Sequence, residues 1–155
     1  MLIKITLFIT LVAYAFIVGQ SFFYILALSN ATKKMGPASY IETRKLIDAE
    51  LQSSLSLVYY LALASTILLT AFSVVNPGGI LFTSSVIAFI ALVIDIAVAL
   101  KGNIPLNKII NNWTVASYPH DWQQVRNRWF SLYHIRQGVN IAGFVSLLAG
   151  LIFGL

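Results

Sequence analysis

At 155 residues the chain suits one domain, and it is too apolar for an ordinary soluble protein. Hydrophobic residues make up 59% and charged residues 10%, against about 25% charged in soluble domains. The lack of cysteine excludes disulfides, thiolate metal sites and a cysteine nucleophile. The net charge of +5 does not indicate nucleic acid as a partner, because the basic residues fall in two loops rather than on one soluble face.

Four apolar stretches have about the length that crosses a bilayer: residues 2–28, 55–75, 80–100 and 137–155. We therefore expect an all-α fold, a single transmembrane four-helix bundle formed by residues 1–155. The first stretch has Lys4 near its start, and the apolar run after Lys4 is longer than that of a signal peptide, so it is interpreted as a retained span ending near Asn30.

The second helix is expected to begin well before its membrane span. Gly36-Pro37 marks a turn, and proline suits the first position of a helix. Apolar residues then recur at helical spacing without a breaker, which predicts one helix from about Pro37 to Val75. The sequence Asn76-Pro77-Gly78-Gly79 predicts a tight turn, so the second and third spans should form an antiparallel hairpin.

The third span is expected to end near Leu100, and residues 101–120 are predicted to form a connecting loop over the end of the bundle. This segment lacks strong periodicity and contains Pro105 and Pro119. Asp121 is a candidate N-cap for a last helix that runs unbroken to Leu155. The second and fourth helices should therefore extend into the cytoplasm.

The distribution of basic residues predicts the orientation of the bundle. The side opposite the two long loops offers only Lys4, whereas the loops hold nine basic residues: Lys33, Lys34, Arg44, Lys45, Lys101, Lys108, Arg126, Arg128 and Arg136. The positive-inside rule places both loops in the cytoplasm and both termini outside. We expect a bacterial inner (plasma) membrane, with the lipid bilayer as the first partner.

Polar residues from all four helices are expected at one depth, in the cytoplasmic half of the membrane. They are Gln20, Tyr24, Gln52, Ser56, Tyr59, Tyr60, Asp95, His134, Arg136, Gln137 and Asn140. A lone carboxylate inside a span costs roughly 2.5–3.5 kcal/mol on insertion scales, so Asp95 needs a partner. Arg136 is the first choice and His134 the second. The pair either pins the third helix to the fourth or lines a pocket.

On the fourth helix, Trp129, Tyr133, Arg136 or Gln137, and Asn140 recur at spacings of three and four, so they share one face. The aromatic residues near the boundary form either an interfacial belt or a stacking surface for a flat substrate: Trp113, Tyr118, Trp122, Trp129 and Tyr133. Small residues permit close helix packing, which is the role expected of Gly19, Gly138, Gly143 and Gly150.

Histidine suits acid–base chemistry near neutral pH, so His134 is either a candidate base or an interfacial side chain satisfied by water. Two histidines and few carboxylates cannot assemble a histidine-rich copper site or a di-iron site. No cofactor is therefore expected, although a haem with His134 as its one axial ligand stays open.

Two motifs in the last third of the chain resemble those of the anthrone-oxygenase-like family of small four-span membrane proteins. The first is Asn103-x-Pro105-x-Asn107, and the second runs from Asp121-Trp122 through Arg126-x-Arg128-Trp129 to Tyr133-His134-x-Arg136. The family includes enzymes that oxidise anthrones to anthraquinones without a classical cofactor. Carried over by position, the resemblance implies these site residues: Asn103, Pro105, Asn107, Trp129, His134 and Arg136.

Under that resemblance, His134 would abstract a proton from a phenol-like carbon acid, and Arg136 would stabilise the enolate as charge develops. Such a carbanion can react directly with dioxygen. The amides of Asn103 and Asn107 would cap the end of the third helix and brace the start of the fourth.

Two classes of function follow. The first is an oxidoreductase or oxygenase acting on a lipophilic aromatic or quinone-like small molecule, with a closed cavity lined by His134, Arg136 and Asn103. Its substrate would be bound by these residues: Asn103, Asn107, Trp129, Tyr133, Asn140, Asp95, Gln20 and Tyr59. The alternative is a non-enzymatic protein that binds a lipid, a quinone or a partner helix. A small transporter would need a homodimer, since four spans without a repeat offer little for alternating access.

Overall fold

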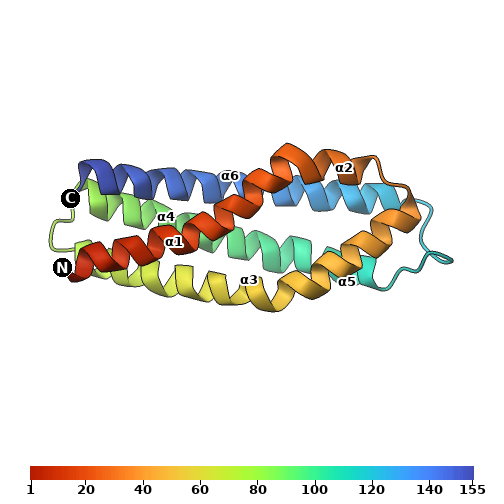
Figure 1. Ribbon diagram of the computed structural model, residues 1–155, viewed down its shortest axis with the longest axis horizontal. Helices are drawn as coiled ribbons and strands as arrows, with labels where there is room; N and C mark the ends of the chain where they lie inside the picture. Colours follow the sequence, from red (N-terminus) through yellow and green to blue (C-terminus); the bar gives the residue numbers. More distant parts are fainter.

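The computed structural model is an all-α bundle of four long helices, in which each helix makes its most extensive contacts with antiparallel neighbours (Figure 1). It describes the backbone of residues 1–155 and every side chain except those of residues 52 and 53. The elements are α1 (Leu2–Phe23), the π-helical turn η1 (Tyr24–Leu28), α2 (Ser29–Lys33), α3 (Pro37–Ser73), α4 (Ile80–Val98), the π-helical turn η2 (Ala99–Asn103), α5 (Ile104–Asn111) and α6 (Trp122–Phe153).

The helices α3 and α6 confirm the two long helices expected from the sequence. Gly36 is the N-cap of α3 and Pro37 occupies its first turn, where its missing N–H costs no hydrogen bond. Asp121 is the N-cap position of α6, although its side chain forms no capping bond. At the other end of the bundle, the N–H of Gly79 donates to the carbonyl of Asn76 at 2.9 Å and closes the predicted tight turn.

Both chain termini and the turn at residues 76–79 lie at one end of the bundle, and the connection of residues 112–121 lies at the other (Figure 1). Each of the four long helices contains a segment long and apolar enough to cross a membrane. The chain is therefore an integral membrane protein. Counting about 20 residues from the end that holds the termini places the far hydrocarbon boundary near Phe23, Ser54, Leu100 and Arg136. Beyond it, α5 and the first parts of α3 and α6 project from the membrane.

The predicted loop over residues 101–120 is wrong for its first half, because helical structure continues through η2 and α5 to Asn111. Pro105 is tolerated because it lies in the first turn of α5, directly after the wider π-helical turn has interrupted the regular hydrogen-bond pattern. Leu106 and Ile110, four residues apart, are both buried and give α5 an inward face.

The first helix also runs further than its predicted end near Asn30, since α2 continues to Lys33. Between its two regular parts lies the turn η1. In Figure 1 the helix crosses the bundle diagonally, and α1 contacts both α3 and α6.

Two hydrophobic clusters form the core. One lies within the membrane span and includes Tyr14, Leu92 and Leu147, and the other fills the projecting end with aromatic side chains. Neighbouring helices pack closely against two glycines of α6. A Cβ on Gly143 would lie 2.8 Å from the hydroxyl of Tyr14, and one on Gly150 would lie 2.9 Å from the Cβ of Ser84.

The expectation of close packing is thus confirmed for Gly143 and Gly150. It is wrong for Gly19 and Gly138, where a Cβ would meet no described atom within 4 Å. Both positions are exposed and face away from the core.

Candidate functional site

The predicted partner of Asp95 is confirmed: Nε of Arg136 on α6 donates to Oδ1 of Asp95 on α4 at 2.6 Å. The Asp95 side chain is fully buried, whereas that of Arg136 is 13% exposed. Nη2 of Arg136 also donates to the hydroxyl of Tyr59 on α3 at 3.3 Å. The guanidinium therefore joins three helices just inside the membrane boundary.

A stack of two aromatic rings between two cations continues from Arg136 toward the projecting end. The guanidinium of Arg136 lies 5.5 Å from the ring centre of Tyr133, and that ring stacks on Trp129 at 4.8 Å. Arg44, from the part of α3 beyond the membrane, covers the Trp129 ring at 4.4 Å. Tyr24 contacts Tyr133 edge-on, with their ring centres 4.5 Å apart. Rings that offer their faces to cations in this way stabilise buried guanidinium groups.

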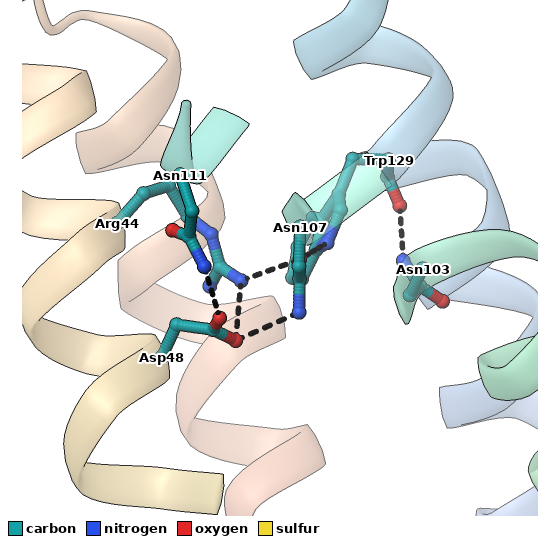
Figure 2. A network of polar contacts seen from close by, with 6 residues as sticks. All are labelled: Arg44, Asp48, Asn103, Asn107, Asn111 and Trp129. Carbon is teal, nitrogen blue, oxygen red and sulfur yellow. Dashed lines mark hydrogen bonds and ion pairs between the residues drawn. The ribbon is translucent and has the colours of Figure 1, made fainter. Parts of the chain in front are cut away.

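Asn107 is the hub of the polar network around Trp129, as Figure 2 shows. Its Oδ1 accepts hydrogen bonds from Nε1 of Trp129 at 2.7 Å and from Nη2 of Arg44 at 2.9 Å. Its Nδ2 donates to Oδ1 of Asp48 at 2.7 Å, while Asn111 donates to the other oxygen of Asp48 at 2.8 Å. This network fastens α5 to α3 and α6, and fixes the orientation of the Trp129 ring.

Asn103, the last residue of η2, braces α6 by donating from Nδ2 to the backbone carbonyl of Trp129 at 3.1 Å. The expected capping of the third helix by Asn103 and Asn107 is not found, because that helix continues through both residues to Asn111. The expected bracing of the fourth helix is formed, and it acts on Trp129 in the second turn of α6 rather than on its first residues.

The structure does not bring His134 together with Arg136. Two residues along a helix correspond to a rotation of about 200°, so the two side chains leave α6 on nearly opposite sides. His134 is exposed and lines a hollow of about 350 Å³ with Lys33, Phe130 and two polar residues of α6. Arg136 points into the bundle toward Asp95. The expected cavity shared by His134, Arg136 and Asn103 is therefore not formed.

Several buried polar atoms near the ion pair have no hydrogen-bond partner among the described residues. They are Oδ2 of Asp95, Oδ1 of Asn103, Oδ1 of Asn140 and both amide atoms of Gln137. Trp129, Tyr133, Gln137 and Asn140 are all buried, which confirms the predicted shared face of α6. Leaving a buried donor or acceptor unpaired costs about 1–3 kcal/mol, so these atoms mark a place where water or a ligand group would be favourable.

Both π-helical turns lie beside this region. Tyr24, the first residue of η1, contacts the rings of Trp129 and Tyr133, and Asn103 ends η2. Single π-helical turns within α-helices occur frequently at functional sites. Here the two turns place the ring of Tyr24 and the amide of Asn103 against the same part of α6.

The boundary aromatics are mainly core residues of the projecting end, so neither an interfacial belt nor an open stacking surface describes them. Trp113, Trp122, Trp129 and Tyr133 are buried, and only Tyr118 of the five is exposed. Tyr40 packs on Trp122 in the same cluster. Burial raises the pKa of Tyr40 to about 12, against the lowering effects of Arg44 and Arg126, so its phenol is neutral at physiological pH.

The remaining expected residues are more peripheral. Gln20 is half-buried on α1 and forms no hydrogen bond with a described residue, and Tyr60 is exposed. Gln52 lies outside the described side chains. The sequence interpretation missed Arg44, Asp48 and Asn111 as partners of the site, because their place in it depends on the unpredicted helix α5. No family model, curated protein or solved structure matches this chain.

Proposed function

We propose that this membrane protein binds the polar head of a lipophilic aromatic or quinone-like molecule at Arg136. The observation that carries the proposal is that described residues occupy only some of the N–H donors of the Arg136 guanidinium. Asp95 and Tyr59 engage its Nε and Nη2, and Nη1 forms no hydrogen bond with a described residue. A guanidinium has five N–H donors in a rigid plane, so donors remain for a carbonyl or ionised hydroxyl of a ligand.

The burial of the two partners supports approach from the bilayer. Asp95 is fully buried and fixes Arg136 from inside the bundle, while the Arg136 side chain remains 13% exposed at the surface. A lipophilic molecule in the bilayer can place its polar end there while its apolar part stays in lipid. The unpaired atoms of Asn140 and Gln137 offer further hydrogen bonds deeper along the same helix.

The resemblance to the anthrone-oxygenase-like family supports a further proposal, that the bound molecule is oxidised. In that reaction a ring CH₂ and O₂ become a ring C=O and H₂O. The position of His134 on the outer side of α6 argues against it as the base beside Arg136. Binding without turnover is therefore the function that the geometry supports best, and oxidation is a separate proposal with its own assay.

The basic residues of the long loops support a second part of the proposal, the orientation with both termini outside a bacterial plasma membrane. The end of the bundle that projects from the membrane carries eight of the ten Lys and Arg side chains: Lys33, Lys34, Arg44, Lys45, Lys101, Lys108, Arg126 and Arg128. A cytoplasmic location of this end follows the positive-inside rule.

Binding is tested on the purified protein in nanodiscs with 2-hydroxy-1,4-naphthoquinone as the probe, followed by quenching of tryptophan fluorescence. The double variant Asp95→Leu/Arg136→Met removes both charges and leaves neither partner unpaired. Its apparent Kd should rise at least about tenfold, the equivalent of about 1.4 kcal/mol. Arg128→Gln, an exposed residue of the same helix, is the matched control and should bind as the parent does. Equal binding by the double variant would refute the proposal.

The same purified protein allows two further measurements. Native mass spectrometry and solvent extraction should reveal a co-purifying aromatic molecule, and an absorbance spectrum would reveal haem. Oxygen consumption with anthrone tests oxidation. Uptake above the uncatalysed rate that is lost in the double variant supports the oxygenase proposal, and uptake at the uncatalysed rate refutes it.

A further inference from the structure

The hollow at the outer side of α6 is distinct from the site around Arg136. It has a volume of about 350 Å³ and is lined by Lys33, Asn127, Phe130, Ser131 and His134. Its polar groups are a primary ammonium, an amide, a hydroxyl and an imidazole, all able to donate hydrogen bonds. No carboxylate is among the described residues that line it. A hollow with several hydrogen-bond donors, one cationic side chain and no carboxylate suits an anionic ligand.

The depth of the hollow matches the layer of lipid headgroups. His134 lies 21 residues from Leu155, which corresponds to roughly 30 Å along a helix, the thickness of the hydrocarbon core. The other lining residues of α6 lie between His134 and Asn127, within about 10 Å beyond that boundary. The hollow thus faces the layer in which phosphate groups are found.

The cation at the mouth of the hollow is held in place. Lys33 Nζ lies 5.8 Å from the ring centre of Phe130, which forms the apolar side of the hollow. Nη1 of Arg126 donates to the backbone carbonyl of Lys33 at 3.2 Å, so a second positive charge braces the end of α2. Arg126 is buried and lies over the Trp122 ring, which fixes this brace.

A path for an acyl chain continues from the hollow along α6. Residues at spacings of three and four share a helix face, and the face of His134 continues through Gly138, Ile141, Val145 and Ile152. Gly138 is exposed, and a Cβ there would meet no described atom within 4 Å. Val145 and Ile152 are exposed apolar side chains. The face is therefore apolar, and at Gly138, one helical turn from His134, it has open space where a side chain would otherwise lie.

We propose that this hollow and the α6 face below it form a binding site for an anionic glycerophospholipid, with the phosphate beside Lys33 and His134 and an acyl chain over Gly138. A basic side chain near an anionic surface contributes about 1 kcal/mol, or about fivefold in affinity. The site accounts for an exposed lysine, an exposed histidine and a glycine that do not contribute to the core. It is independent of the ligand proposed for Arg136.

The test is native mass spectrometry of delipidated protein titrated with phosphatidylglycerol or phosphatidylcholine of the same chain length. Phosphatidylglycerol should bind at least about fivefold more tightly. The variant Lys33→Gln/His134→Gln should remove this preference. Lys34→Gln, an exposed neighbour that does not line the hollow, should preserve it. Equal binding of both lipids by the parent, or an unchanged preference in the double variant, would overturn the proposal.

Two further arms identify the source of the anion and the path of the chain. Glycerol 3-phosphate should not compete at concentrations at which phosphatidylglycerol saturates the protein, and effective competition would assign the hollow to a soluble phosphate instead. Gly138→Leu should weaken phosphatidylglycerol binding at least about threefold, whereas Gly19→Leu, an equally open glycine on α1, should not. Equal effects of the two substitutions would remove the acyl-chain path.

The Asp95→Leu/Arg136→Met variant should retain the lipid preference whether or not Arg136 binds its own ligand.

Discussion

The ion pair between Asp95 and Arg136 allows a quantitative test of how the bundle is held together. Asp95→Leu leaves an arginine side chain that is 13% exposed and close to the boundary, so that its guanidinium can turn toward the headgroups. Arg136→Met leaves a carboxylate that is fully buried and whose Oδ2 accepts no hydrogen bond from a described residue. Removing the arginine should therefore destabilise the fold more than removing the aspartate.

Removing one partner of a buried ion pair generally costs about 3–5 kcal/mol, whereas replacing both with apolar side chains is often neutral or stabilising. Arg136→Met should fall in that range. Asp95→Leu should cost about 1–3 kcal/mol, because the guanidinium can recover water at the interface. The double variant should unfold within about 1 kcal/mol of the parent, which implies a coupling free energy of at least about 3 kcal/mol.

The measurement is the free energy of unfolding in bicelles by steric trapping, on the parent, both single variants and the double variant. Arg128→Met, at an exposed position of the same helix, should change the free energy by no more than about 0.5 kcal/mol. If the double variant loses as much as the two single variants together, the two side chains do not stabilise one another and the assignment of the pair is wrong.

Three other predictions follow from the geometry. Gly143→Val should destabilise the bundle by about 1–3 kcal/mol in the same unfolding assay, because its Cβ would lie 2.8 Å from Tyr14, whereas Gly138→Val should be tolerated. Trp129→Phe should cost about 1–2 kcal/mol by leaving an acceptor site on Asn107 unfilled, and a smaller loss would show that the indole bond is dispensable. Reporter fusions at the 76–79 turn and after Leu155 should both report an outside location, and an inside signal at either would reverse the proposed orientation.

The sequence predicted most of the fold because membrane helices are strongly constrained. A backbone in lipid must satisfy its own hydrogen bonds, so each apolar stretch of about 20 residues had to be a helix. Pro37 in the first turn and the turn at Asn76–Gly79 then fixed the ends of α3. The partner of Asp95 was also predictable, since Arg136 was the cation at the matching depth on a neighbouring helix.

The sequence does not predict the helix over residues 104–111, because the segment after Leu100 lacks strong periodicity and contains Pro105 and Pro119. Its buried apolar positions, Leu106 and Ile110, are only two, and the π-helical turn before Pro105 shifts their register relative to α4. A change of register hides the periodicity of 3.6 on which the interpretation depended. Without α5, Asn107 could not be placed beside Asp48 and Arg44, so the network of Figure 2 was missed with it.

The separation of His134 from Arg136, by contrast, was available from the sequence. A spacing of two residues on one helix directs side chains to nearly opposite sides. The resemblance places both residues in one motif, and residues of one motif are expected to act at one site. The structure shows that neighbouring motif residues serve two places, with Arg136 turned to Asp95 and His134 turned to the hollow beside Lys33.

The stack between Arg44 and Arg136 explains how two arginines can be largely buried in so apolar a chain. Each guanidinium has a carboxylate of its own, Asp48 for Arg44 at 3.6 Å and Asp95 for Arg136 at 2.6 Å, so the assembly as a whole carries no net charge. Trp129 and Tyr133 separate the two cations and offer each a ring face in place of water. The rings also hold the guanidinium groups in fixed planes. A neutral, rigid arrangement of this kind lets Arg136 present its remaining N–H groups to a ligand without the cost of an isolated charge in the membrane.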